Sequence, residues 1–184
     1  MIVLKGEHIT LRNHRMSDAD DIYRNINDPR ICKMIYGLPW PYKKKHAKDF
    51  LKTWVGRREK KPCAIRFAIV LNETKEVIGC INLHSINWQH KRAETGTWLG
   101  VNHWGKGYNI ESKKLLLNYA FKKLKLHKII LGTLSKNKRS QKAIKKLGAK
   151  KEAILKDHMF IEGKYYDSIT YRILKKEWKP SKVK

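Results

Sequence analysis

Apolar and polar residues alternate along several stretches of the chain with the two-residue period of a β-strand. Runs such as "CAIRFAIVL" and "AETGTWLGV" are rich in β-branched and aromatic residues, which favour strands. The pattern predicts strands at 8–14, 63–71, 76–86, 93–101 and 128–135, and a final hairpin over 152–174 that turns at Glu162-Gly163. The polar turn "NETK" joins the second and third of these strands into a hairpin as well.

Other stretches repeat their apolar residues every three to four positions, which predicts helices with one buried face. The longest stretch begins near Tyr108 and ends near Lys125. Its apolar positions are Ile110, Leu115, Leu116, Tyr119, Ala120 and Leu124. A second helix is predicted from Pro41 to about Arg58, because apolar residues share one of its faces.

Two shorter helices complete the predicted order. Ser17 with Asp20 three residues later resembles a capping box and predicts the helix "DADDIYRNI", and a further helix is predicted over 138–147. The chain shows no internal repeat and no flexible linker. The elements fit one α+β domain over 1–178, with a mostly antiparallel sheet of about six or seven strands and about four helices. A basic tail follows at 179–184.

The composition supports a packed core and argues against a membrane span. Of the 184 residues, 41% are hydrophobic and 10% aromatic, which is too many for a disordered chain. No apolar run approaches the ~20 residues that cross a bilayer, and the N-terminal residues lack the apolar segment of a secretory signal. Cys32, Cys63 and Cys80 are too scattered for a disulfide framework or a zinc site, which predicts buried, reduced thiols in a cytoplasmic protein.

The chain is strongly basic. It has 42 Lys+Arg against 16 Asp+Glu and a net charge of +26, which attracts polyanions and repels polycations. The richest run, "KNKRSQKAIKKLGAKK" at 136–151, contains no acidic residue. The excess of lysine is equally consistent with a general solubility bias, so charge alone does not establish a nucleic-acid partner.

The stretch "GVNHWGKGYN" at 100–109 holds a glycine turn between a predicted strand and a predicted helix. It matches the start of the phosphate loop G-x-x-x-x-G-K-[ST], but Gly107 stands where a hydroxyl residue is required. It also begins a dinucleotide fingerprint, whose last glycine is replaced by Ile110. Because free N–H groups at a helix N-terminus attract anions, the turn is either an anion site or a plain turn without a ligand.

Four motifs follow one another along nearly the whole chain. They are "RAETGTWLG" at 92–100, "WGKGY" at 104–108, the segment from Asn137-Lys138-Arg139-Ser140 to Lys146-Leu147-Gly148-Ala149 and Glu152, and "GKYYDSITYRILKKEW" at 163–178. Together they resemble the GNAT superfamily of N-acetyltransferases. Within it they are most similar to the RimJ/RimL-type branch, which acetylates ribosomal proteins.

The resemblance implies an acyltransferase that uses acetyl-CoA and no metal, with the coenzyme arm where strands 93–101 and 128–135, the fourth and fifth, splay apart. It implies that Leu99 and Val101 line the arm through their backbones and that Asn137 holds it by its side-chain amide. The turn expected to cradle the pyrophosphate comprises Trp104, Gly105, Lys106, Gly107, Tyr108, Asn109 and Ile110.

The chain departs from the family pattern at three positions. Asn109 replaces the final glycine or alanine of the turn, and Thr97 replaces a usual tyrosine. Ile144 stands where polyamine-acetylating relatives have a tyrosine that acts as an acid. These positions bear on coenzyme binding and catalysis rather than on the fold.

Amide formation from a thioester needs a base for the amine, a polarised carbonyl and a proton for the departing thiolate. Glu94, near the start of the cleft strand, is the favoured base, although it is equally consistent with a surface carboxylate. His84 is the rival, because its ordinary pKa suits a base. A backbone N–H near Leu99 is expected to polarise the carbonyl. Ser140 is a candidate acid, but such a residue more often caps a helix.

The acceptor predicted from charge and chemistry is the α-amine of a protein. A surface of this charge disfavours polyamines and suits proteins embedded in RNA, so association with the ribosome or RNA is expected, and no membrane partner. Two alternatives remain: acetylation of small amines such as polyamines or antibiotics, and a weakly catalytic module that binds nucleic acid. The sequence leaves the oligomeric state open.

Overall fold

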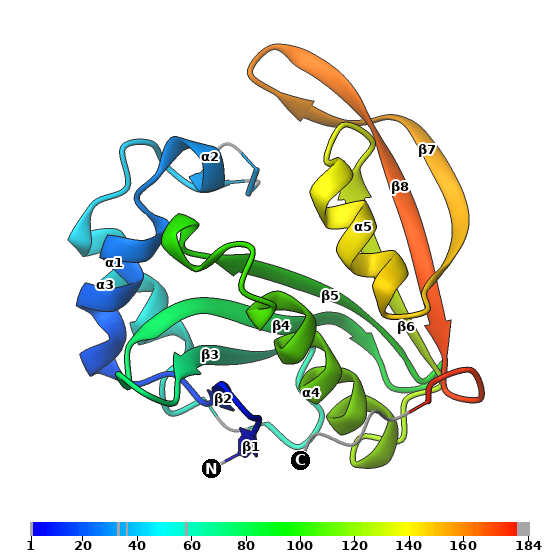
Figure 1. The fold of residues 1–184 in the computed structure, drawn as a ribbon, viewed down its shortest axis with the longest axis horizontal. Coiled ribbons are helices and arrows are strands. Elements are labelled where there is room, and N and C mark those ends of the chain that lie inside the picture. Colours follow the sequence, from blue (N-terminus) through cyan, green and yellow to red (C-terminus); the bar gives the residue numbers. More distant parts are fainter. Residues whose placement is uncertain (1, 33, 36, 58, 180–184) are drawn as a thin grey trace.

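The computed structural model describes residues 2–32, 34–35, 37–57 and 59–179. This part of the chain forms one eight-stranded sheet in the order β1-β2-β3-β4-β5-β6-β8-β7, flanked by five α-helices (Figure 1). The strands are β1 Val3–Lys5, β2 Ile9–Arg12, β3 Ile65–Leu71, β4 Val77–Asn87, β5 Arg92–Leu99, β6 Lys128–Leu134, β7 Lys150–Ile161 and β8 Lys164–Leu174. The α-helices are α1 Ala19–Ile26, α2 Pro29–Cys32, α3 Lys44–Trp54, α4 Tyr108–Lys122 and α5 Lys138–Lys146.

The predicted strands are all present. The fold is α+β and its sheet is mostly antiparallel, as expected. The prediction missed β1, whose three residues are too few for a period to be visible, and α2, which is a single turn. The final hairpin turns at Glu162-Gly163, as predicted. Among the described residues, no helix is long and apolar enough to cross a membrane.

The start of the first long helix differs from the prediction. The capping role assigned to Ser17 and Asp20 is wrong: a short 3-10 turn, Met16–Asp18, precedes α1. The buried Asp18 carboxylate instead accepts hydrogen bonds from the Arg15 N–H, at 2.9 Å, and from the Arg12 guanidinium, at 2.7 and 2.9 Å. An ion pair between Arg12 and Asp18 therefore fixes this corner.

The second predicted helix is shorter than expected. The helix α3 begins at Lys44 rather than at Pro41 and ends at Trp54, while Arg58 lies outside the described residues. The cysteine prediction is also wrong in part, because Cys63 is exposed, whereas Cys32 and Cys80 are buried. Of the basic tail, only Lys179 belongs to the described residues.

Two apolar clusters cover the two faces of the sheet. The larger one packs α4 and α5 against one face through residues such as Leu116, Phe121 and Ile144. The smaller one packs α1 and α3 against the other face through residues such as Ile22 and Leu51. The sheet is therefore buried on both sides along β3 and β4, which holds the neighbouring strand β5 in a fixed position.

The strands β5 and β6 form the parallel pair of the sheet, joined by α4 as a crossover. Their ladder runs from Arg92↔Lys128 to Thr95↔Leu131 and then stops. Both strands continue without pairing to each other, β5 to Leu99 beside β4 and β6 to Leu134 beside β8. Figure 1 shows the β6–β8–β7 part, with α5, diverging from the rest beyond this point. The predicted splay between these two strands is confirmed.

Candidate active site

A gap in the strand pairing lies immediately beyond the last β5–β6 pair. Each strand carries a glycine at the first position of this gap, Gly96 on β5 and Gly132 on β6. A Cβ on Gly132 would meet nothing within 4 Å, and one on Gly96 would meet only the Asn82 side chain. The glycines therefore leave the gap clear on their face of the sheet.

Backbone N–H groups of β5 point into this gap. The Gly100 N–H donates to Ile78 of β4 at 2.9 Å, so the alternation of the strand turns the N–H groups of Thr97 and Leu99 away from β4, towards β6. No β6 residue pairs with them, because the ladder ends at Thr95. These two N–H groups point in the direction needed to donate a hydrogen bond to an acyl oxygen or to the carbonyl oxygen of a ligand amide.

The glycine turn lies between β5 and α4. Gly105 and Gly107 have φ angles of 81° and 86°, and Gly107 is the residue that precedes the first turn of α4. A Cβ added to either glycine would meet nothing within 4 Å. Among the described residues, no acceptor faces the backbone N–H groups of 105–109. With the positive end of the α4 dipole, these groups form a concave donor surface suited to a diphosphate.

Asn109, which departs from the family pattern, does not close this surface. It is the second residue of α4, and its Oδ1 atom is buried without a hydrogen-bond partner among the described residues. Its carbonyl accepts a hydrogen bond from the Ser112 hydroxyl at 2.9 Å. The open turn is therefore compatible with the diphosphate of a coenzyme.

The aromatic residue of the turn, Trp104, connects it to the neighbouring elements. Its indole N–H donates to the Leu99 carbonyl at 2.8 Å, and its ring stacks 3.3 Å from the Arg139 guanidinium of α5. Val101 lies in a short 3-10 helix, and its carbonyl accepts the Trp104 N–H at 3.1 Å. The carbonyls of Leu99 and Val101 are therefore already occupied, which leaves N–H groups for any ligand.

The N-cap of α5 is Asn137 rather than Ser140. Asn137 caps this helix, because its Oδ1 atom accepts the Ser140 N–H at 3.0 Å. The capping role considered for Ser140 is wrong, since Ser140 lies in the first turn. The N–H groups of the Asn137 amide remain available as hydrogen-bond donors. Ile144, on the same helix, is buried in the core.

Glu94 and His84 lie opposite each other in the register of β5 and β4. Both are half-buried, on the sheet face opposite α4. Burial lowers the pKa of His84; nearby Glu94 acts to raise it and Arg66 acts to lower it. His84 is therefore mainly neutral at neutral pH. The Arg66 guanidinium stacks 4.3 Å from the ring of Trp54 on α3, which bounds this surface.

Sequence reasoning missed Lys113. It lies on α4 but faces the sheet, is 7% exposed, and donates a hydrogen bond to the Thr97 hydroxyl at 3.0 Å. The available signal was a lysine beside the apolar positions of an amphipathic helix, which is usually read as solvent-exposed. In the part of the chain that the structure describes, no group of His, Cys, Asp or Glu could hold a metal ion.

The site therefore has a glycine turn with unpaired N–H groups at the N-terminus of α4, a gap in the sheet, and a carboxylate with a neutral imidazole on the sheet face opposite α4. This arrangement defines an acyltransferase that brings two substrates together through a sheet. A family model described as an acetyltransferase (GNAT) domain matches residues 8–150. The chain belongs to this family of N-acetyltransferases, whose members use acetyl-CoA.

Named relatives and a solved structure agree with this family. The spermidine N(1)-acetyltransferase of Vibrio cholerae is 29% identical over 94% of this chain and 96% of its own length. The ribosomal protein uS5-alanine N-acetyltransferase of Escherichia coli is 24% identical over 78% of each chain. The crystal structure of the ribosomal-protein-S5-alanine acetyltransferase from Vibrio fischeri has a TM-score of 0.84 and 23% identity, covering 98% of this chain and 100% of its own.

Proposed function

We propose that this protein transfers the acetyl group of acetyl-CoA to the N-terminal α-amine of a protein. The observation that carries this proposal is the gap beyond Thr95, which has the anion-binding turn on one face of the sheet and Glu94 with His84 on the other. An acetyl-CoA molecule held at the turn and an amine held beside Glu94 would meet only in this gap.

Each group has one task in this proposal. The N–H groups of 105–109 bind the diphosphate, and the Asn137 amide contacts the arm. The N–H groups of Thr97 and Leu99 polarise the thioester carbonyl. Glu94 takes a proton from the amine, directly or through a water molecule. The fixed sheet contributes by holding both substrates in line, which supplies much of the rate.

The choice of an α-amine rests on acidity and charge. An α-amine has a pKa near ~8 and a lysine side chain near ~10.4, so at neutral pH a free lysine amine costs about 3 kcal/mol more. The net charge of +26 repels polyamines, while a protein N-terminus within RNA does not suffer this repulsion. The ribosomal-protein relative supports this class, and the spermidine relative keeps small amines as the alternative.

The acceptor class is tested by measuring thiol release from acetyl-CoA with a panel of amines. We expect peptides that copy ribosomal-protein N-termini to be acetylated at least tenfold faster than spermidine at equal concentration, because both charge and amine pKa favour them. Nα-blocked peptides that keep an internal lysine serve as the control. Faster turnover of spermidine would replace the protein acceptor by a small amine, and no turnover with tight RNA binding would indicate a binding module.

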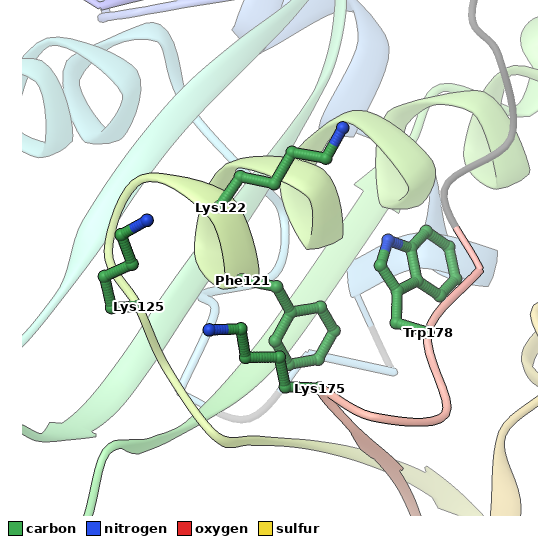
Figure 2. Close-up of a pocket in the computed structure, with 5 residues that line it drawn as sticks. All are labelled: Phe121, Lys122, Lys125, Lys175 and Trp178. Carbon is green, nitrogen blue, oxygen red and sulfur yellow. The ribbon is translucent and has the colours of Figure 1, made fainter.

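A basic pocket at the C-terminal end of α4, away from the glycine turn, supports the proposed association with RNA. Lys122, Lys125 and Lys175 surround the rings of Phe121 and Trp178, with a cavity of about 240 Å³ (Figure 2). Among the described residues, none of these three ammonium groups has an ion-pair partner. The carboxylate of nearby Glu177 is already bound by Lys150 and Arg172.

Replacing the three pocket lysines together by glutamine is expected to weaken sedimentation with ribosomes at low salt about tenfold or more, since each phosphate contact contributes to binding and to its salt dependence. A matched variant changes Lys45, Lys60 and Lys61 to glutamine; these residues are exposed, do not line the pocket, and lose the same charge. Equal losses in both variants would show that total charge acts rather than the pocket. Absence of ribosome sedimentation by the unchanged protein would end this part of the proposal.

A further inference from the structure

A buried ammonium group lies between α4 and β5, where it contacts a residue in the segment of β5 that does not pair with β6. Lys113 is 7% exposed, and within the described residues it has no carboxylate partner and one acceptor, the Thr97 hydroxyl at 3.0 Å. An ammonium carries three N–H donors, so two of them have no acceptor in the protein. Because burial without an ion pair disfavours a charge, it lowers the pKa of Lys113 to about 8.

A second polar group at the same place also lacks a partner. The hydroxyl of Thr95 is buried, with the residue 6% exposed, and it has no hydrogen bond among the described residues. Thr95 is the last residue of β5 that pairs with β6 and Thr97 is the second beyond it, so both side chains lie on the face that Lys113 contacts. A buried donor without a hydrogen bond destabilises the folded protein. The unpaired groups of Lys113 and Thr95 therefore indicate that a polar ligand forms hydrogen bonds with them.

The ligand that enters the gap from this face is the acyl donor, if the proposed function is correct. Its diphosphate would lie at the N-terminus of α4, and Lys113 is on the second turn of the same helix. The thioester sulfur must lie close to the unpaired N–H groups of β5 for its carbonyl to reach them. Lys113, through Thr97, already contacts this segment of β5.

We propose that Lys113 is the catalytic acid that protonates the sulfur of the departing coenzyme, which rests on the function proposed above. As the C–N bond of the amide forms, the C–S bond breaks and its electron pair goes to sulfur. Lys113 transfers one N–H proton to that sulfur, which yields the free thiol and a neutral lysine amine. Glu94 takes the proton that the substrate amine loses, and exchange with water resets both groups.

The chemistry of the alternatives favours this assignment. Ile144 is buried and apolar, so it has no proton to give, and the Ser140 hydroxyl is a much weaker acid than an ammonium. A thiol has an ordinary pKa near ~8.5, so a group of similar acidity transfers a proton to it without a large energetic mismatch. Lys113 and Glu94 also lie on opposite faces, so the acid and the base cannot neutralise each other.

The test compares Lys113→Met with Lys114→Met, which removes the same charge from the next residue of the helix. For Lys113→Met we expect kcat to fall about 100-fold with little change in the acetyl-CoA KM, and for Lys114→Met no more than a twofold change. The unchanged protein should lose kcat as the pH rises through about 8, because only protonated Lys113 acts. This alkaline limb should be absent from Lys113→Met.

A readout without turnover follows the thiolate absorbance of bound coenzyme A during a pH titration. The Lys113 ammonium should lower the pKa of the bound thiol by about one unit in the unchanged protein, and Lys113→Met should lose this shift. Lys113→Arg keeps the charge but is too weak an acid to donate, so it should preserve the shifted thiol and remain slow. These two measurements separate proton donation from charge alone.

Three results would overturn the assignment: full activity of Lys113→Met, an unchanged alkaline limb in that variant, or restored kcat in Lys113→Arg. Each of them requires an active unchanged protein, so it leaves the proposed function intact. If the unchanged protein instead transfers no acetyl group to any amine, the proposed function fails and the role of Lys113 with it. Thermal unfolding of each variant controls for folding, and the thiol titration remains informative for any variant that binds coenzyme A.

Discussion

Replacing Gly107 by glutamate is expected to abolish measurable binding of acetyl-CoA. Gly107 precedes the first turn of α4 with φ at 86°, a conformation that costs an L-residue about 1–2 kcal/mol. The new side chain would meet no protein atom within 4 Å of its Cβ, so steric conflict inside the protein is not the cause. Its carboxylate would instead lie where the diphosphate is expected, and two like charges at that distance repel strongly. Isothermal titration calorimetry measures the loss.

Gly163→Glu is the matched control for this variant. Gly163 turns the β7–β8 hairpin with φ at 79° and, like Gly107, has open space around its Cβ position. The control therefore introduces the same residue and the same backbone strain far from the turn. Gly107→Ala adds the strain without the charge and should weaken binding only about tenfold. Binding of acetyl-CoA to Gly107→Glu with unchanged affinity would show that the diphosphate does not lie at this turn.

Local chemistry explains why the turn was predictable from the sequence. Two glycines between a strand and an amphipathic helix have few structural meanings, and both Gly105 and Gly107 adopt the left-handed conformation that favours glycine. The strands were predictable for the same reason, because alternation is a property of each strand alone. The family motifs added the order of the elements and hence the position of the splay between β5 and β6.

Pairwise contacts between distant segments explain what the sequence did not reveal. The Trp104 indole binds the carbonyl of Leu99 and stacks on Arg139, which lies on α5. The position of Lys113 depends on which face of α4 meets β5, and a lysine is normally assigned to solvent. In each case a polar group is satisfied across the fold, and hydropathy patterns carry no record of such pairs.

The register of the sheet shows how the two candidate catalytic bases, Glu94 and His84, lie relative to each other. Sequence reasoning treated Glu94 and His84 as rivals at separate places, but they face each other across β4 and β5. Burial lowers the pKa of His84, with Arg66 acting in the same direction, so His84 is mainly neutral at neutral pH and can accept a hydrogen bond. A carboxylate beside a neutral imidazole can therefore work as one unit, in which one group takes the proton and the other orients the amine or a water molecule.

Glu94→Gln is expected to lower kcat about 1,000-fold while the KM for acetyl-CoA changes little. The amide keeps the size and hydrogen-bonding reach of the carboxylate but cannot accept a proton from the amine. The loss should shrink at high pH, because a growing fraction of the acceptor amine is then already neutral. Initial rates of thiol release between neutral and alkaline pH measure both effects. Glu73→Gln, an exposed carboxylate in the "NETK" turn, removes the same charge and should leave the rate unchanged.

The corresponding His84→Asn variant decides between the two groups. If Glu94 is the base, removing the imidazole should cost less than about tenfold in kcat, since it only orients the proton acceptor. If the histidine were the base, His84→Asn would show the larger loss of kcat, and Glu94→Gln would show only a modest one. A further distinction comes from the acid limb of the pH profile, where a neutral histidine base is lost as the pH falls through its pKa. Because burial depresses the pKa of His84, that limb would lie below the ordinary histidine range.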